Sequence, residues 1–125
     1  MDKLNRIFAM QKELDSDIIA LRKLESISSQ EWIQKDVLAI VAELGELLNE
    51  TSFKWWKNPK EINIAALQEE IVDVLHFFIS LCIHAGLNAD SLFELYAAKN
   101  IENFDRQHGR SDKPGYSAMD NEAGH

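Results

Sequence analysis

Two pairs of acidic residues, each with a spacing of three, are the feature of this sequence best suited to chemistry. Glu43 and Glu46 form one pair, and Glu70 and Asp73 form the other. A spacing of three places both members of a pair on one face of an α-helix. Two antiparallel helices with such pairs can direct four carboxylates into one space, where a divalent cation relieves their repulsion. Ligands that are all oxygen favour Mg²⁺, Mn²⁺ or Ca²⁺ over zinc.

The sequence around both pairs is apolar. Residues 38–48 and 71–75 contain few polar side chains other than these carboxylates, as is typical of buried bundle helices. A solvated helix face is the commoner explanation for an isolated Glu-x-x-Glu. A carboxylate in apolar surroundings is costly unless it is paired or binds a metal, so the context favours a metal site.

Cationic and polar residues near the C-terminus complement these acids. Lys99, Asn103 and Arg106 are spaced i, i+4 and i+7 and therefore share a helix face. A phosphate chain held between metal ions and these side chains would explain both sets, since arginine suits phosphate oxygens. The alternative is a salt-bridged helix end, where the macrodipole favours cations in any case.

Three kinds of residue are open to two interpretations. Gln11 lies on an apolar helix stripe; its amide can pair with a uracil edge or with another helix. Phe77 shares the face of Glu70 and Asp73, where it can bound the sugar or base, or simply pack in the core. The tryptophans, which are Trp32, Trp55 and Trp56, can stack on a base or pack within a bundle or dimer.

The elements that must position these residues are all helices. Apolar residues recur with helical periodicity, and no alternating strand pattern competes. The first helix is expected over about residues 3–24. The second begins near Ser28, which has capping-box spacing with Glu31, and continues to about residue 50.

The second half of the chain predicts two more helices. The third begins either at Asn58, before Pro59, or at Asn63, and runs to about residue 84, with Gly86 as its C-cap. Asp90 or Ser91 caps the fourth, which runs to about residue 107. Four helices with short connections predict a four-helix bundle-like, all-α domain over residues 1–108. Residues 109–125 are expected to form a polar tail.

Composition limits the partners. A chain of 125 residues fits one domain, and its net charge of −8 argues against a nucleic-acid surface. No run of 18 apolar residues and no signal-peptide core is found, so no membrane span is expected and the cytoplasm is the expected location. The single cysteine, Cys82, lies in an apolar run and is expected to be a buried small hydrophobe.

The doubled acidic motif resembles the metal-binding signature of the all-α NTP pyrophosphatase superfamily, which includes MazG-type enzymes and the dimeric dUTPases. Further segments are similar to the dimeric dUTPase branch in particular. These are Glu43–Glu50, Phe53–Trp56, Glu69–Phe77 and Lys99–Gln107. The resemblance extends over about residues 4–116.

The resemblance implies a role for each matching residue. Glu43, Glu46, Glu70 and Asp73 would hold Mg²⁺, for which Mn²⁺ can substitute, and Glu46 would also orient the attacking water. The residues assigned to the substrate are Gln11 for the uracil, Phe77 and the loop residue Lys54 for the nucleotide, and Lys99, Asn103 and Arg106 for the phosphates. Lys99 and Arg106 would also stabilise charge during the reaction.

These expectations combine into one function. The chain would hydrolyse a deoxynucleoside triphosphate, foremost dUTP, to dUMP and pyrophosphate, as a homodimer or homotetramer. One alternative is a MazG-like NTP pyrophosphohydrolase with another or a broad substrate range. The other is a non-enzymatic helical interaction module with a solvated acidic face.

Overall fold

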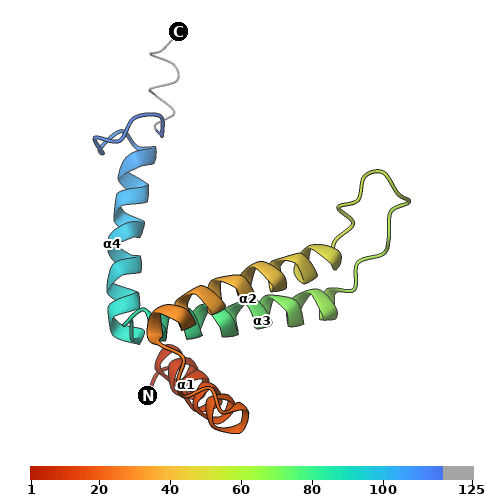
Figure 1. Ribbon diagram of the computed structural model, residues 1–125. Coiled ribbons are helices and arrows are strands. Elements are labelled where there is room, and N and C mark those ends of the chain that lie inside the picture. Colours follow the sequence, from red (N-terminus) through yellow and green to blue (C-terminus); the bar gives the residue numbers. More distant parts are fainter. Residues whose placement is uncertain (117–125) are drawn as a thin grey trace. The chain divides into compact units, whose positions relative to one another are not determined.

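The computed structural model describes residues 1–116, and this part of the chain is helical without any strand. The four helices are α1 (Lys3–Arg22), α2 (Ser29–Asn49), α3 (Ile64–His84) and α4 (Ala89–Gln107). Figure 1 shows them in chain order. The prediction of an all-α, four-helix fold is therefore confirmed.

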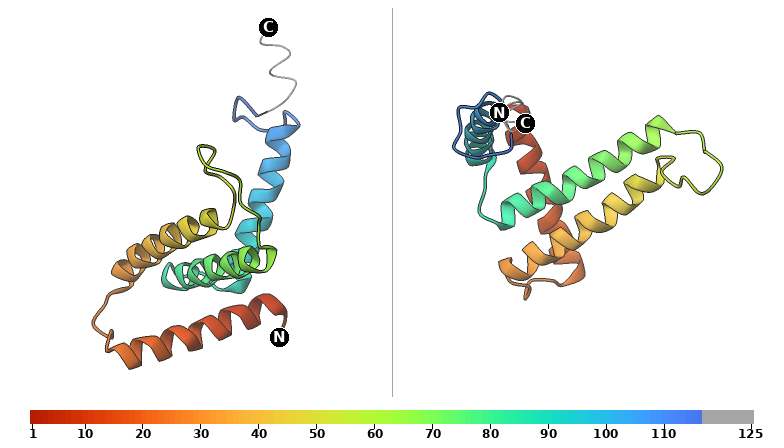
Figure 2. Two further views of the ribbon diagram at one scale, coloured as in Figure 1. Left: turned by 90° about the vertical axis from the view of Figure 1, so that its right-hand side faces the viewer. Right: turned by 90° about the horizontal axis from the view of Figure 1, so that it is seen from above.

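Helices α2 and α3 form an antiparallel hairpin. They lie side by side along their lengths in every view, joined at one end by the loop of residues 50–63 (Figures 1 and 2). In this hairpin Glu43 and Glu46 of α2 lie opposite Glu70 of α3. This pairing is the element of the fold that positions the site.

Helix α1 packs against α3. The small core contains Phe8 from α1 with Ile79 and Cys82 from α3, all nearly inaccessible to solvent. Cys82 is free and buried, as expected. The chain divides into two compact units, the first comprising residues 1–88 and the second beginning at Ala89.

The starts of α2 and α3 follow from their capping residues. The Ser28 hydroxyl accepts a hydrogen bond from the Glu31 amide at 3.2 Å, which confirms the predicted start of α2. The Asn63 side chain accepts from the Ala66 amide at 3.1 Å. Of the two predicted starts of α3, Asn63 is therefore correct, and Asn58 and Pro59 remain in the loop.

The connection between α3 and α4 is very short. Gly86 adopts φ +88°, and the Leu87 amide donates to the Cys82 carbonyl at 2.8 Å, which closes α3 with a Schellman turn. Helix α4 begins at Ala89, so the prediction that Asp90 or Ser91 caps it is wrong. The Schellman turn ends α3 within a few residues, so Asn88 directly precedes α4. Asparagine is one of the residue types favoured at the N-cap position of a helix.

Asp90 instead lies in the first turn of α4, where the helix dipole favours an acid. Among the residues described, no single helix is long and apolar enough to cross a membrane. The polar tail predicted for residues 109–125 falls partly outside the described residues, and the boundary at residue 108 stays a prediction.

Candidate metal and nucleotide site

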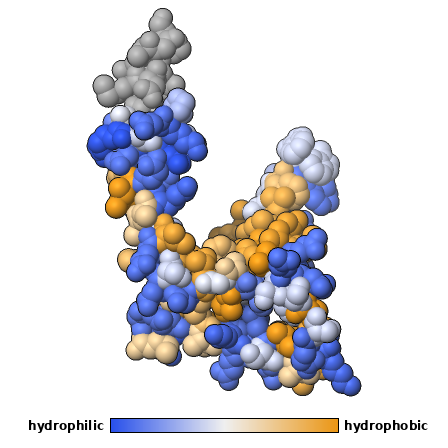
Figure 3. All heavy atoms as spheres, turned by 60° about the vertical axis from the view of Figure 1, so that its left-hand side comes forward, coloured by the Kyte–Doolittle hydropathy of each residue, from blue (hydrophilic) through white to orange (hydrophobic). Residues whose placement is uncertain are grey.

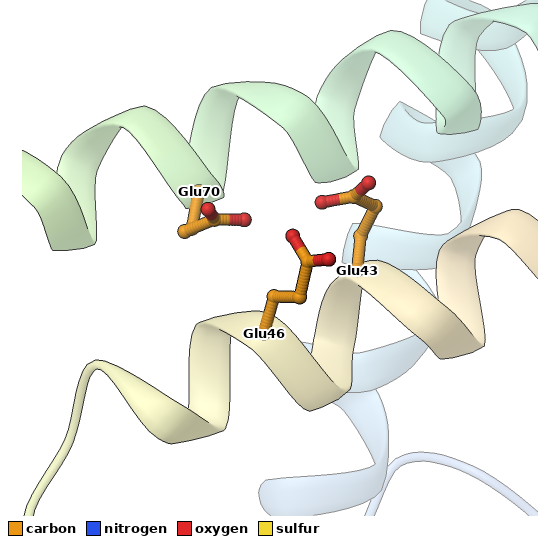
Figure 4. A group of neighbouring side chains, drawn as sticks. All are labelled: Glu43, Glu46 and Glu70. Carbon is orange, nitrogen blue, oxygen red and sulfur yellow. The ribbon is translucent and has the colours of Figure 1, made fainter.

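Three of the four predicted metal ligands converge. Glu43, Glu46 and Glu70 each offer one carboxylate oxygen, and these three oxygens lie within 4.8 Å of one another. Figure 4 shows the first two rising from α2 toward Glu70 on α3. The hairpin thus brings together residues that are 24 to 27 positions apart in the chain.

Burial and charge destabilise the ionised forms of this cluster. Oε2 of Glu43 and Oε2 of Glu70 are buried and have no hydrogen-bond partner. Loss of hydration, then the charge of Glu46, raises the pKa of Glu43. Loss of hydration, the neighbouring carboxyl group of Glu43 and the charges of Glu46 and Asp73 raise the pKa of Glu70 to about 7.

Asp73 stands beside this cluster. It lies one turn beyond Glu70 on α3, is exposed, and its charge contributes to the raised pKa of Glu43 and of Glu70. It also lines a shallow groove along α3 together with Val72 and Glu69. Its carboxylate is not among the three oxygens that converge, although it acts on them electrostatically.

The donor set fits a hard divalent cation. Three convergent carboxylates, two of them with unpartnered buried oxygens, give oxygen ligands, and no histidine or cysteine of residues 1–116 belongs to the group. A cation would satisfy the unpartnered oxygens and cancel the repulsion that raises the pKa values. The site is therefore chemically suited to Mg²⁺ or Mn²⁺.

Gln11 is buried, with an exposed fraction of 6%. Its Nε2 donates to Asp15 Oδ1 at 2.9 Å, and its Oε1 lies 2.6 Å from Nδ1 of His76. It is thus bonded to another helix, while also lining an apolar pocket of about 410 Å³ between α1 and α3. The predicted contact of Gln11 with uracil stays a prediction.

A polar network through the first unit was missed by the sequence analysis. The Ser80 hydroxyl donates to Asp15 Oδ2 at 2.7 Å, and His84 Nδ1 donates to Asp36 Oδ2 at 2.6 Å. Burial raises the pKa of Asp36, while the hydrogen bond from His84 opposes this. A signal was present, because His76, Ser80 and His84 recur every fourth residue and so share one face of an otherwise apolar helix.

The other predicted contacts on the first unit lie at separate places. Lys54 lines a pocket of about 300 Å³ in the loop after α2, together with Phe53, Lys57 and Lys60. Phe77 is half-buried on α3, one turn beyond Asp73. Trp32 stacks on His84, with ring centroids 5.5 Å apart, and so packs within the unit. Trp55 and Trp56 contact each other edge to face in the loop, and Trp55 is 86% exposed.

Lys99, Asn103 and Arg106 all lie on α4, in the second unit. Arg106 Nη1 donates to Asn103 Oδ1 at 3.4 Å, and Arg106 Nε donates to Glu102 Oε1 at 3.1 Å. Lys99 is exposed, three residues before Glu102. Their meeting with the carboxylates of the first unit stays a prediction.

Comparison with known proteins identifies the class. A dUTPase family model matches residues 3–90, which include α1, α2, α3 and all four predicted metal ligands. The chain belongs to this dUTPase family, within the all-α NTP pyrophosphatases, a group of nucleoside triphosphate diphosphatases. The match to the family model ends at the start of α4, so it does not include the predicted phosphate-binding residues.

Two curated phage proteins share a shorter stretch. The dCTP pyrophosphatase of Enterobacteria phage T4 is 45% identical over 38 residues, which is 30% of this chain and 22% of the phage protein. The dCTP pyrophosphatase of Enterobacteria phage LZ5 is 47% identical over the same shares. The similarity thus spans about a fifth of the length of these relatives. No solved structure matches.

Proposed function

We propose that this chain hydrolyses a deoxynucleoside triphosphate to the monophosphate and pyrophosphate, with dUTP as the preferred substrate and Mg²⁺ as the cofactor. The observation that carries the proposal is the convergence of Glu43, Glu46 and Glu70 from two paired helices. Membership of the dUTPase family supports hydrolysis of a nucleoside triphosphate. The carboxylate cluster supports dependence on a divalent cation.

The role that we propose for each carboxylate follows from its burial. Glu43 and Glu70, whose buried oxygens have no partner, hold the cation, and Asp73 completes the ligand set. Glu46 is the exposed member of the cluster, so its carboxylate can accept a hydrogen bond from the attacking water and orient it toward the α-phosphorus. Bound Mg²⁺ supplies neutralisation of charge on the triphosphate.

The cationic residues act on the phosphates. Lys99 and Arg106 stabilise the negative charge that develops on the leaving pyrophosphate, and Asn103 binds the phosphate or sugar. Lys54 contributes a further positive charge from the loop pocket, where Lys57 and Lys60 add two more. No covalent intermediate with the protein is required by this arrangement.

Gln11 and Phe77 are the proposed contacts to the nucleoside. Asp15 is an acceptor, so it holds the Gln11 amide with Nε2 toward itself and Oε1 toward His76. The remaining N–H of this fixed amide favours a carbonyl oxygen. We propose that this N–H donates to the C4 carbonyl of uracil, where cytosine has an amino group; the C2 carbonyl, common to both bases, would not distinguish them.

The phage relatives favour a second candidate, hydrolysis of dCTP. Both are named dCTP pyrophosphatases, although only 22% of each is matched. A panel of dUTP, dCTP, dTTP, dATP and dGTP, assayed for pyrophosphate release with Mg²⁺ and with EDTA, separates the candidates. Fastest release from dUTP that EDTA abolishes supports the proposal, whereas equal rates on all five indicate a broad pyrophosphohydrolase.

Glu46→Gln tests the chemistry itself. Loss of the carboxylate that orients the water should lower kcat by at least about 100-fold, with unchanged helical circular dichroism. Glu61→Gln in the exposed loop removes the same charge outside the cluster and should leave kcat unchanged. Near-normal turnover by the Glu46 variant would remove this residue from the mechanism.

We further propose that the active form is a homodimer, or a tetramer made of two such dimers. Large apolar side chains are exposed along the hairpin, including Val41, Leu44 and Leu48 on α2 and Ile71 on α3. Figure 3 shows hydrophobic residues gathered along this part of the first unit. A second copy that covers them would bury apolar surface that a small domain otherwise leaves in water.

A further inference from the structure

The carboxylate of Glu102 holds two groups from different parts of the second unit. Its Oε1 accepts from Arg106 Nε at 3.1 Å, one helix turn away, and from the Ser111 hydroxyl at 2.7 Å. The Arg106 side chain is only 14% exposed, against 40% for Glu102. The guanidinium is therefore confined within the second unit.

Ser111 reaches this carboxylate because the chain reverses after α4. Gly109 adopts φ +72°, and the Arg110 amide donates to the Asp105 carbonyl at 2.8 Å, closing the helix with a Schellman turn. The following residues turn back along the helix, so that the ring of Tyr116 lies 5.2 Å from the Arg106 guanidinium carbon. The guanidinium is thus bounded by a carboxylate and an aromatic face.

These contacts leave part of the Arg106 guanidinium without a hydrogen bond. Nε is occupied by Glu102, and one hydrogen of Nη1 points to Asn103 at 3.4 Å. One hydrogen of Nη1 and both hydrogens of Nη2 have no hydrogen-bond partner among the residues that the structure describes. Parallel hydrogens on Nη1 and Nη2 form the pair that grips two oxygens of one phosphate.

We propose that Glu102 and Ser111 are positioning residues, which hold Arg106 so that its Nη1–Nη2 edge meets a substrate phosphate. The inference rests on the proposed function, since it specifies how that phosphate is held. Hydrogen bonds from Ser111 and then Arg106 keep the pKa of Glu102 below its usual value, so the carboxylate is ionised at neutral pH. The anchor therefore keeps its charge under the conditions of the reaction.

Replacement of Glu102 separates positioning from simple electrostatics. Glu102→Ala removes a negative charge near the phosphate, which by itself would strengthen binding of an anion. If the carboxylate positions Arg106, the same change frees a long side chain and lowers kcat/KM roughly tenfold. The direction of the change therefore decides between the two roles, and a rise in kcat/KM would overturn the proposal.

Conservative variants sharpen the test. Glu102→Gln keeps an oxygen that can accept from Arg106 and Ser111, so it should retain kcat/KM within about threefold. Ser111→Ala should cause a smaller loss than Glu102→Ala. Glu94→Ala removes the same charge from an exposed position on the same helix and should have no effect. Loss in the Gln variant equal to that in the Ala variant would contradict positioning through hydrogen bonds.

A double-mutant cycle with Arg106 gives the decisive kinetic result. In an Arg106→Ala background, Glu102→Ala should cause no further loss, because the group that it positions is gone. Additive losses would show that Glu102 acts independently of Arg106, and would overturn the inference.

A readout without turnover keeps this inference separate from the proposed function. The Arg106 Nε–H signal in ¹H–¹⁵N spectra should be ordered in the wild-type chain and in Glu102→Gln, and lost in Glu102→Ala. Added inorganic pyrophosphate should shift this signal in the wild type. If the wild type releases no pyrophosphate from any nucleotide, the proposed function fails, while these spectra still decide the inference. An unchanged signal in Glu102→Ala, or no response to pyrophosphate, would overturn it.

Discussion

Glu70 differs from its neighbours because its carboxyl group is both poorly hydrated and surrounded by other carboxylates. Its pKa is raised to about 7, with loss of hydration as the main cause and Glu43, Glu46 and Asp73 as further causes. A carboxylate in this state gains most from a cation, which removes the repulsion. Protons and Mg²⁺ should therefore compete at this residue near neutral pH.

The raised pKa of Glu70 makes the stability of the metal-free chain depend on pH. The pKa of Glu70 lies above its ordinary value of 4.5, so between these values the folded chain holds a proton that the unfolded chain has released. The stabilising contribution is complete below about pH 4.5 and is lost as the pH rises through about 7. Unfolding in urea with EDTA should therefore need less urea at pH 8 than at pH 5.5, and added Mg²⁺ should reverse this loss.

Glu70→Gln should flatten the part of this pH dependence that Glu70 causes, because an amide does not titrate. Glu69→Gln, at the adjacent exposed position, is the matched control and should keep the wild-type slope. A Glu70 variant with an unchanged slope would show that this carboxyl group has an ordinary pKa in the folded chain.

Gln11 is the residue that we expect to determine selectivity for the base. Its amide is held by Asp15 and His76 at one side of an apolar pocket. Gln11→Ala should relax the preference for dUTP over dCTP by about tenfold, with a smaller loss of kcat on dUTP. Gln34→Ala, at an exposed position on α2, should change neither. Equal selectivity of wild type and variant would confine Gln11 to a structural role.

At the scale of helices, periodicity and capping residues were enough to predict the fold. Ser28, Asn63 and Gly86 mark helix ends through local hydrogen bonds that depend on residue type. The sequence therefore indicated Ser28 and Gly86, and left Asn63 as one of two possible starts of α3. The start of α4 was misplaced because a tight Schellman turn, rather than the capping strength of Asp90, determines where it begins. Glu43, Glu46 and Glu70 were predictable as a cluster because helix spacing and an antiparallel hairpin suffice to bring them together.

The polar network between α1, α2 and α3 could not be predicted in the same way. Nothing in the sequence distinguishes Asp15 and Asp36 from solvated acids, and only tertiary packing brings them to Ser80 and His84. The partners of Gln11 depend on the same packing. Long-range pairing of this kind carries no local signal beyond the four-residue spacing on α3.

The pair formed by Asp36 and His84 joins α2 to the end of α3. Asp36 is 4% exposed, so its removal would leave His84 without its acceptor in a poorly hydrated place. Asp36→Ala should lower the free energy of unfolding by about 2–4 kcal/mol, measured by urea denaturation. Asp17→Ala, exposed on α1, should change it by less than about 0.5 kcal/mol. Equal midpoints would show that this pair contributes little to the hairpin.

At the scale of the whole molecule, the apolar side chains that the single chain leaves exposed support the proposed dimer. Few large side chains are fully buried in the described part of the chain, whereas Val37, Val41, Leu44 and Leu48 form an exposed stripe along α2. Their spacing of four, three and four places them on one helix face. Gly45 lies within this segment, and a Cβ added there would meet no atom of the described chain, which leaves room for close approach by a second copy.

Val41→Glu should therefore convert a dimer into a monomer. Val41 is 60% exposed in the single chain, so the substitution should leave its fold intact, whereas a buried charge in a dimer interface would cost several kcal/mol. Light scattering after size exclusion gives the mass of each form, and pyrophosphate release shows whether turnover falls with it. Gln30→Glu, which adds the same charge at an exposed position of α2, should remain dimeric. The proposed dimer would be refuted if the wild-type chain were monomeric and fully active at assay concentrations. The exposed stripe along α2 would then have no role in catalysis.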